Sequence, residues 1–423
     1  MPRKPSQRLP QAAAAHARLD ALRKELLKFT TEFVAIDTTN PPGRNYLPCC
    51  EFLAAKLKTL GLKPQILRVP PHDQAPLVPG LDDYPRYNLV ARWDVGAKRT
   101  LLFTGHYDVV PATSGWKTDP FKAYVKQEKL YGRGTSDMKG CDAAAIFAVQ
   151  ALQESGQTPP WNVELAFTAD EETGGYAGLG WLVKSGALKA DRAVLLEGGS
   201  GENLGIAHRG VLWLEVTVHG KAGHAANPKN GINALEKALP LIRRLKRLER
   251  AYASRRSAYL GAKHARRPTL MIGGVCGGGG KINTIPDAFT FSIDRRLIPE
   301  DRLSDVKREL AEAIKDAQRE DPDLKVSVKY PLYVESGHTA PDEPVVATAL
   351  EAYRAVSGKR AKLRMTGGFT DMHFLTRDGK IPSVGYGAQG GGAHSDLEFL
   401  NLASQVQTAK FYAEMAVRTQ GER

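Results

Sequence analysis

The order of strand and helix signals changes in the middle of the chain, and this change constrains the fold more than any other feature. Short apolar runs alternate with helical stretches up to residue 207 and again from residue 332. Such alternation favours a three-layer α/β domain with a mostly parallel sheet. The stretch between them reads strand, helix, strand, strand, helix, strand, which is typical of a ferredoxin-like α+β unit. We therefore predict a discontinuous α/β domain, residues 1–207 and 332–423, with a second domain inserted at residues 208–331.

Hydrophobic periodicity places the individual elements. In the α/β domain we expect strands at residues 87–93, 100–104, 163–168, 193–196 and 381–386, and helices at residues 12–34, 50–60, 143–154, 345–356 and 402–417. In the inserted domain we expect strands at residues 211–219, 269–274, 288–297 and 325–333, and helices at residues 233–252 and 303–319.

Composition excludes several classes of protein. No apolar stretch reaches the ~20 residues that span a membrane, and the N-terminal stretch lacks the apolar core of a secretory signal. The four cysteines form no CxxC pair, which argues against a disulfide framework and a thiolate metal site. We therefore expect a cytoplasmic protein that binds no membrane. The net charge of +13 raises the question of a polyanionic or acidic partner.

Imidazole and carboxylate side chains follow the ends of the expected strands in the α/β domain. In an open sheet of this kind the ligand crevice lies at the carboxyl ends of the strands, so these side chains are expected to converge. Two imidazoles and three carboxylates suit two closely spaced Zn²⁺ ions that share one carboxylate, with Mn²⁺ and Co²⁺ as alternatives. The candidate ligands are His106, Asp137, Glu172, Glu197 and His394.

Two further carboxylates lie next to these candidates. Asp108 is two residues beyond His106, on the same side of an extended segment, where it could receive the imidazole N–H. Glu171 is adjacent to Glu172 and could take a proton from metal-bound water.

In order and spacing, these residues resemble the two-metal amidohydrolases that include acetylornithine deacetylase, succinyl-diaminopimelate desuccinylase, aminoacylase and glutamate carboxypeptidase. The resemblance covers nearly the whole chain from Asn40 onward, including the inserted domain, which corresponds to a lid and dimerisation domain. It implies that His106 and Glu197 hold one metal, that Glu172 and His394 hold the other, and that Asp137 bridges them. It also implies that Asp108 orients His106 and that Glu171 is the general base. The motifs that carry it are His106-x-Asp108, Gly134-Thr-Ser-Asp-Met-Lys-Gly140, Glu171-Glu172, Glu197 and His394.

The inserted domain and a later Gly-rich loop contain further matches to the family. His224, in Gly-Lys-Ala-Gly-His-Ala, resembles a histidine that crosses a dimer interface to polarise the substrate carbonyl, so the resemblance implies a homodimer formed through the lid. Asn283 and Arg296 resemble residues that bind a substrate carboxylate, with Gly368 and Phe369 in the loop beside it. Simpler structural roles remain open: a helix cap for His224, a lid ion pair for Arg296 and packing under the loop for Phe369. Arg295 competes with Arg296 for the carboxylate.

The predicted function is hydrolysis of the amide bond of a small carboxylate-bearing molecule, such as an N-acyl amino acid or a dipeptide. The attacking group would be a metal-bridged hydroxide, with Glu171 as base. One alternative is hydrolytic deamination of an aminoaromatic acid at the same site, for which Phe369 is the only hint. Another is an inactive hydrolase fold that binds nucleic acid through the basic stretch 243–267. Because no ligand is missing, we expect no nucleic-acid partner.

Overall fold

The computed structural model describes residues 11–419, and the remaining ends of the predicted α/β domain lie outside the described residues. The chain divides into two compact units. The first unit has a segment that ends at Ile206, a second segment His338–Arg364 and a third that begins at Thr370. The second unit comprises Ala207–Gly337 and Met365–Phe369.

The five residues Met365–Phe369 were expected in the α/β domain but group with the second unit. The backbone N–H of Met365 donates to the carbonyl of Leu260 at 2.5 Å. The Met365 side chain packs in a small buried cluster with Ala207 and Ala265. The Gly-rich loop with Gly368 and Phe369 therefore belongs with the inserted unit.

The first unit is built on an eight-stranded sheet with a parallel centre. Neighbours β6, β3, β7 and β16 run parallel, whereas β1, β2 and β8 add antiparallel strands on the two sides. The strands, in sheet order, are β1 (Gln65–Arg68), β2 (Tyr87–Trp93), β6 (Asn162–Thr168), β3 (Thr100–His106), β7 (Arg192–Leu195), β16 (Ser383–Gly385), β8 (Asn203–His208) and β15 (Lys362–Thr366).

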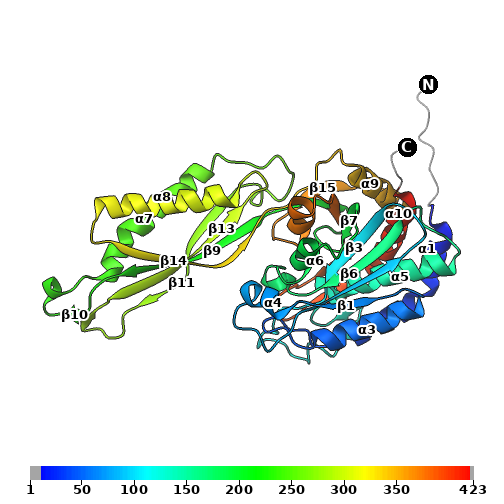
Figure 1. Ribbon diagram of the computed structural model, residues 1–423, viewed down its shortest axis with the longest axis horizontal. Helices are drawn as coiled ribbons and strands as arrows, with labels where there is room; N and C mark the ends of the chain where they lie inside the picture. The colour runs from blue at the N-terminus through cyan, green and yellow to red at the C-terminus, as the bar shows by residue number, and fades with distance from the viewer. Residues whose placement is uncertain (1–10, 420–423) are drawn as a thin grey trace, which may run out of the picture. The chain divides into compact units, whose positions relative to one another are not determined.

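Helices cover both faces of this sheet (Figure 1), and the sequence of β3 shows why. Leu102 packs into a cluster with Leu179 and Leu182 of helix α6 (Leu179–Ser185). The ring of Phe103, on the opposite face, has its centre 5.6 Å from that of Tyr412 in helix α10 (Leu402–Arg418). A strand that is buried on both faces is apolar throughout, as expected for the centre of a three-layer α/β domain. This confirms the predicted fold class.

The predicted helices of the first unit begin and end close to the expected residues, with one split, and the short helices Pro71–Leu77 and Leu179–Ser185 were not predicted. The helix expected at residues 12–34 is two helices that meet at Leu22. The helix expected from residue 50 begins earlier, directly after Asn45, whose φ of 50° is left-handed. The helices are α1 (Ala13–Ala21), α2 (Arg23–Val34), α3 (Tyr46–Thr59), α4 (Pro71–Leu77), α5 (Gly140–Glu154), α6 (Leu179–Ser185), α9 (Pro344–Ser357) and α10 (Leu402–Arg418).

A small antiparallel sheet joins the C-terminal part of the chain to a segment near residue 130. Leu400 of β18 pairs with Leu130 of β5 and with Gly390 of β17. The pairing places the residues around His394 beside the loop that follows β5. The strands, in order, are β17 (Gly390–Gly391), β18 (Phe399–Asn401), β5 (Lys129–Tyr131) and β4 (Tyr124–Lys126).

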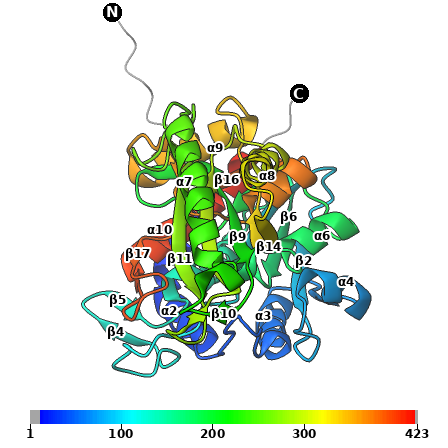
Figure 2. The same ribbon diagram turned by 90° about the vertical axis from the view of Figure 1, so that its left-hand side faces the viewer.

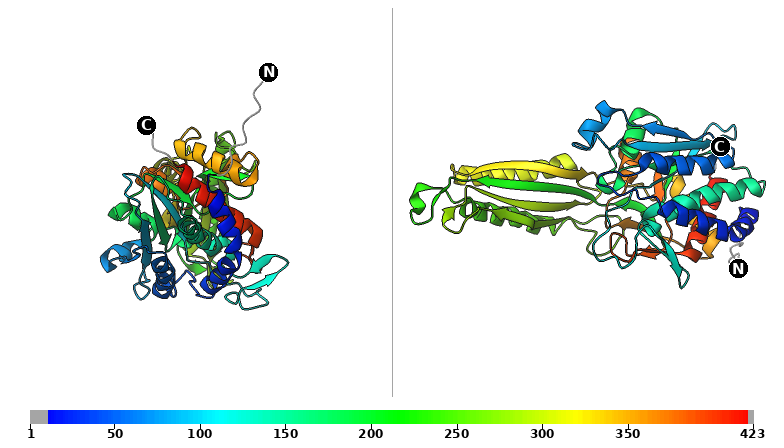
Figure 3. Two further views of the ribbon diagram at one scale, coloured as in Figure 1. Left: turned by 90° about the vertical axis from the view of Figure 1, so that its right-hand side faces the viewer. Right: turned by 90° about the horizontal axis from the view of Figure 1, so that it is seen from below.

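The second unit is the expected ferredoxin-like arrangement. Its sheet has the order β11, β13, β9, β14, and two helices lie on one face (Figures 1 and 2). Along β9, Leu212, Leu214 and Val216 are buried while Trp213 and Glu215 are exposed. This period of two indicates a sheet covered on one face only, and the view from below in Figure 3 shows the uncovered strands. The elements are β9 (Gly210–His219), α7 (Ala234–Tyr252), β11 (Thr269–Gly278), β13 (Ala288–Leu297), α8 (Leu303–Glu320) and β14 (Lys325–Val334).

Candidate metal centre

The candidate ligands of the first unit follow neighbouring strands of the sheet. His106 is the last residue of β3, Glu172 lies just after the adjacent β6, and Glu197 lies two residues after β7. Asp137 comes from the turn Thr135–Lys139 before α5, and His394 from the loop between β17 and β18. The predicted convergence at the carboxyl ends of the strands is present, because ligand atoms of all five residues occur in clusters whose members lie within 4.8 Å of one another.

Asp137 stands between two sets of donors. Its Oδ1 lies 3.4 Å from His106 Nε2, and its Oδ2 lies 3.2 Å from His394 Nε2. On the first side Glu197 completes a cluster with His106 and Asp137, and on the second side Glu172 Oε2 lies 3.0 Å from His394 Nε2. One carboxylate thus presents one oxygen to each set.

Several metal-binding atoms of this site are buried and make no hydrogen bond within the protein. They are His106 Nε2, Glu172 Oε1 and Glu197 Oε1. Buried polar atoms are nearly always hydrogen-bonded, so three such atoms in one cluster fit a bound group that interacts with all of them. A donor set of imidazole nitrogens and carboxylate oxygens, without sulfur, suits divalent ions such as Zn²⁺, Mn²⁺ or Co²⁺. The residues therefore fit a metal.

Crowding of negative charge distorts the titration of the cluster. Burial and the neighbouring Asp137 raise the pKa of Glu172 to about 7. Burial also raises the pKa of Glu171 and of Glu197 well above the usual range. Hydrogen bonds to Asp137 and Glu172 raise the pKa of His394 to about 10. A bound dication would favour the ionised carboxylates and the neutral imidazoles, so metal binding at this site is expected to release protons.

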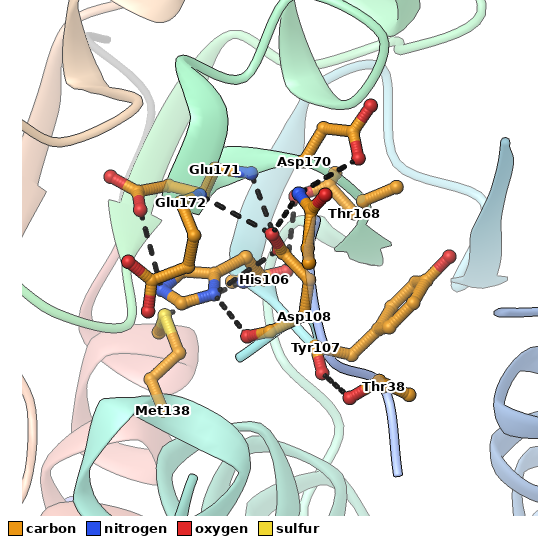
Figure 4. Close-up of polar contacts among 12 residues, drawn as sticks. Thr38, His106, Tyr107, Asp108, Met138, Thr168, Asp170, Glu171 and Glu172 are labelled. Atoms are coloured by element: carbon orange, nitrogen blue, oxygen red, sulfur yellow. Dashed lines mark hydrogen bonds and ion pairs between the residues drawn. The ribbon is translucent and has the colours of Figure 1, made fainter. Parts of the chain in front are cut away.

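Asp108 connects His106 to the turn that carries the two glutamates (Figure 4). His106 Nδ1 lies 3.0 Å from the backbone oxygen of Asp108 and 3.4 Å from its carboxylate Oδ1, so the carbonyl is the nearer acceptor. The carboxylate accepts the backbone N–H of Glu171 at 3.2 Å and of Glu172 at 3.3 Å. Asp108 therefore fixes the glutamate turn as well as facing the imidazole.

Asn40 is a member of this network that the sequence analysis did not assign. Its Nδ2 donates to Asp108 Oδ2 at 2.9 Å, to Asp170 Oδ1 at 3.0 Å and to Thr173 Oγ1 at 3.0 Å. Asp170 in turn forms a buried ion pair with Arg86 at 2.8 Å. The available signal was that Asn40, in Asn40-Pro-Pro-Gly43, is where the family resemblance begins; no role was assigned to it.

Glu171 lies at the edge of the ligand cluster. Its side chain is buried, and its Oε2 is 3.8 Å from His106 Nε2. The Asp371 carboxylate adds to the negative field that raises the pKa of Glu171, after burial and the charges of Glu197 and Glu172. Asp371 itself is buried, and burial raises its pKa to about 7.

The remaining predicted residues belong to the second unit. His224 is exposed in β10 (Gly223–His224) and pairs with Thr284 of β12 (Thr284–Ile285). The carbonyl of Asn283 accepts the N–H of Ala225 at 3.0 Å, so the His224 and Asn283 segments lie side by side. The Nδ1 of His224 accepts the N–H of Ala226 at 3.1 Å. The following helix is capped by Asn233 rather than by His224.

The structure separates the two neighbouring arginines of β13. Arg295 is fully buried, pairs with Asp301 at 3.0 Å and stacks 4.1 Å above the ring of Tyr252. Arg296 is partly exposed, and its Nε and Nη2 bond Asp294 at 2.8 and 2.9 Å.

The Gly-rich loop lies in the same unit as these arginines. The carbonyl of Gly368 accepts the N–H of Arg209 at 3.2 Å, and Phe369 is partly buried.

Comparison with known proteins matches most of the chain. The model of peptidase family M20/M25/M40 matches residues 102–418. A succinyl-diaminopimelate desuccinylase from Gluconobacter oxydans is 31% identical over 346 residues, which cover 79% of this chain and 84% of that protein. An acetylornithine deacetylase from Pasteurella multocida is 32% identical over 261 residues, 62% of this chain and 63% of that protein. The structure of a dipeptidase from Saccharomyces cerevisiae aligns with a TM-score of 0.75 at 18% identity, covering 97% of this chain and 99% of that one.

Proposed function

The chain belongs to peptidase family M20/M25/M40, and from that premise we propose that it cleaves the amide bond of a small substrate bearing a free carboxylate. Membership makes it a metal-dependent amidohydrolase. Among the similar proteins are a desuccinylase of succinyl-diaminopimelate, a deacetylase of acetylornithine and a dipeptidase. An N-acyl amino acid or a dipeptide is therefore the substrate class we propose.

The position of Asp137 carries this proposal. One carboxylate oxygen of Asp137 faces His106 and the other faces His394. Asp137 is therefore placed to bind two divalent ions, for which Zn²⁺ is the first candidate. His106 and Glu197 would hold one ion, and Glu172 and His394 the other. When bound, such ions supply Lewis acidity that polarises a carbonyl and makes water more acidic.

We assign the proton transfers to Glu171. It is the carboxylate beside the ligand cluster that the proposed ligand set leaves unused, and Asp108 holds its backbone N–H at 3.2 Å. It would accept a proton from the attacking water and return it to the leaving amine, as a general base and then a general acid. Asn40 and Asp108 would hold the turn with Glu171 and Glu172 in a fixed position relative to His106.

The substrate carboxylate is assigned to the second unit. Arg296 is partly exposed, whereas Arg295 is buried against Asp301 and Tyr252, so Arg296 is the arginine that a ligand can reach. Its planar guanidinium suits bidentate binding of a carboxylate. Asn283, Gly368 and Phe369 are proposed to line the same subsite.

We assign stabilisation of the developing oxyanion to His224, donated by the lid of a second copy. His224 is exposed, and its segment pairs with that of Asn283, so the two residues would act together. This assignment includes the homodimer through the second unit, since the resemblance places the histidine in the other subunit's site.

Three cations of the basic stretch, Arg244, Lys246 and Arg255, form ion pairs. Arg244 pairs with Asp316 and Glu320, and Arg255 pairs with Asp301 and Glu309. Cations that already pair with carboxylates displace few counterions from the phosphates of a nucleic acid. The hydrolase proposal is preferred to a nucleic-acid-binding one because all five proposed metal ligands are present and their donor atoms cluster.

Metal removal followed by a substrate screen tests the proposal. Protein stripped by a chelator, and reloaded with Zn²⁺, Mn²⁺ or Co²⁺, is assayed against N-acyl amino acids, dipeptides and aminoaromatic acids. We expect amino-acid release only from the reloaded protein. Activity that survives exhaustive chelation, or ammonia release from aminoaromatic acids alone, would overturn the proposal.

The Glu171→Ala variant is the matched control for that screen. It should bind zinc as the parent does, because Glu171 is not among the proposed ligands. Its turnover should fall by roughly 10²- to 10⁴-fold, the typical contribution of general acid–base catalysis. A Glu171→Ala protein with parental turnover would remove the base assignment while leaving the metal centre intact.

A further inference from the structure

Glu398 is a buried carboxylate that lies beneath the turn carrying Asp137. It is fully buried and immediately precedes β18. Its Oε1 accepts the backbone N–H groups of Ser136 at 2.9 Å and of Asp137 at 3.0 Å. Its Oε2 accepts the N–H of Gly134 at 3.0 Å. One side chain therefore satisfies three backbone donors of a single turn.

Arg133 completes the arrangement from the other direction. Its Nη1 donates to Glu398 Oε2 at 2.8 Å, and its Nη2 donates to the carbonyl of Ser395 at 3.1 Å. Ser395 follows His394 in the chain. The buried guanidinium therefore bonds the segment of one candidate ligand, His394, while its partner carboxylate bonds the segment of another, Asp137.

The contacts of Arg133 with Glu398 and Ser395 link parts of the chain that are 265 and 262 residues apart. Apart from β17 and β18, the segment from Gly390 to Asn401 is loop, so side-chain bonds are needed to fix it. Gly134, with a φ of 82°, begins the turn in a left-handed conformation. In such a turn the N–H groups point to one side, where a carboxylate stabilises them strongly. Without Glu398 these buried donors would lose their acceptor, which is unfavourable.

We propose that Arg133 and Glu398 form a clasp that sets the position of Asp137 relative to His394. Both are positioning residues, because neither presents an atom to the cluster of donor atoms. The proposal rests on the proposed metal centre and names the residues that build its geometry. It predicts that loss of the clasp weakens metal binding in protein that is still folded.

The test is zinc affinity, measured by titration calorimetry on metal-free full-length protein, with thermal unfolding recorded in parallel. Glu398→Gln keeps the shape of the side chain but places an amide NH₂ against Arg133 or against backbone N–H donors. We expect its zinc dissociation constant to rise by roughly 10- to 100-fold, the typical effect of losing an outer partner of a metal ligand.

Glu414→Gln is the matched control. Glu414 is also a fully buried carboxylate of the first unit, accepts one backbone N–H, from Ala12 at 3.0 Å, and pairs with an arginine, Arg418. It is bonded to neither ligand segment in these contacts. Glu414→Gln should lower the unfolding temperature and leave the zinc dissociation constant of the folded protein unchanged.

Arg133→Lys decides the question if Glu398→Gln does not fold. It keeps the charge but loses the fork that joins Glu398 to Ser395, and we expect a several-fold weaker zinc affinity. Parental zinc affinity in a folded clasp variant, or an equal loss in Glu414→Gln, overturns the clasp. A parent that binds no divalent metal overturns the proposed function instead. A parent that binds zinc and hydrolyses no amide refutes the function and leaves the clasp to be judged by the affinities.

Discussion

The two units hold their candidate functional residues in different ways. In the first unit His106 and Asp108 are at most 1% exposed and are bonded to each other and to the glutamate turn. In the second unit His224 and Asn283 are exposed and are held by the backbone pairing of two short segments. The His106 side of the first site is fixed by buried side chains, although His394 is exposed, whereas the residues of the second unit lie on the surface.

This difference suits two different tasks. A metal centre needs several ligands held in one geometry before the ion arrives, and buried partners supply that rigidity. Residues that grip a substrate or a second copy gain their geometry from the complex, so they must remain accessible. We therefore expect changes in the first unit to alter metal affinity, and changes in the second unit to alter turnover or substrate affinity at constant metal affinity.

The largest effect is expected from Asp137→Ala. The change removes the carboxylate that faces both histidines, so zinc affinity should fall beyond the roughly 10- to 100-fold typical of outer partners. Hydrolysis should become undetectable. Titration calorimetry and metal analysis of the purified protein measure the loss.

Asp94→Ala is the control for this variant. Asp94 is an exposed carboxylate of the same unit that accepts the N–H of Gly96, and its removal should leave zinc affinity unchanged. Parental zinc content in Asp137→Ala would show that the cluster is not the metal centre, and the contrast between the units would then have no basis.

Much of the fold could be predicted because most longer strands show a clear hydrophobic pattern in the sequence. The strands at residues 87–93 and 288–297 begin and end as expected. In the eight-stranded sheet, β1, β8 and β15 were missed. In β1 and β15, four or five partly exposed residues carry little periodic signal. The helix at residues 12–34 was expected as one helix, because its apolar spacing continues through the break at Leu22.

The candidate site was only partly accessible to sequence reasoning. Each proposed ligand stands at a strand end or in a recognisable motif, so spacing was informative. Asn40 and Glu398 act through hydrogen bonds to distant segments, and no local pattern encodes those bonds. The alternation along β13 could have predicted which of Arg295 and Arg296 is buried, because Phe291 and Ile293 face the core. The period of two then buries Arg295 and leaves Arg296 on the open face.

A smaller effect, confined to turnover, is expected from His224→Ala. Loss of one oxyanion donor lowers kcat by roughly 10²- to 10³-fold, while zinc affinity should stay at the parental value because His224 lies in the other unit. Steady-state kinetics and zinc titration on the same preparation separate the two quantities.

Mixing two inactive variants tests whether His224 acts in a second copy's site. In mixed dimers of His224→Ala and Glu171→Ala, one of the two sites has both residues intact. Random exchange should therefore restore up to about a quarter of parental activity, as expected for a twofold interface. Mixtures with no more activity than the separate variants would place His224 in its own subunit's chemistry or outside it.

The smallest effects should come from the carboxylate subsite, in KM. Arg296→Met removes a charge-assisted pair worth about 1.5–3 kcal/mol, so KM for a carboxylate substrate should rise roughly 10- to 100-fold, with zinc affinity unchanged. Asp294→Asn should act in the opposite direction and lower KM a few-fold, because Asp294 competes for the same guanidinium at 2.8 Å.

Arg295→Met distinguishes a substrate contact from a structural ion pair in the same strand. It would leave Asp301 buried without its partner, and loss of one member of a buried pair costs about 3–5 kcal/mol. We therefore expect a lower unfolding temperature and an unchanged KM, the reverse of Arg296→Met. If Arg295→Met instead raised KM in folded protein, the alternation of β13 would not decide which arginine binds substrate. The second unit would then resemble the first in using buried residues for binding.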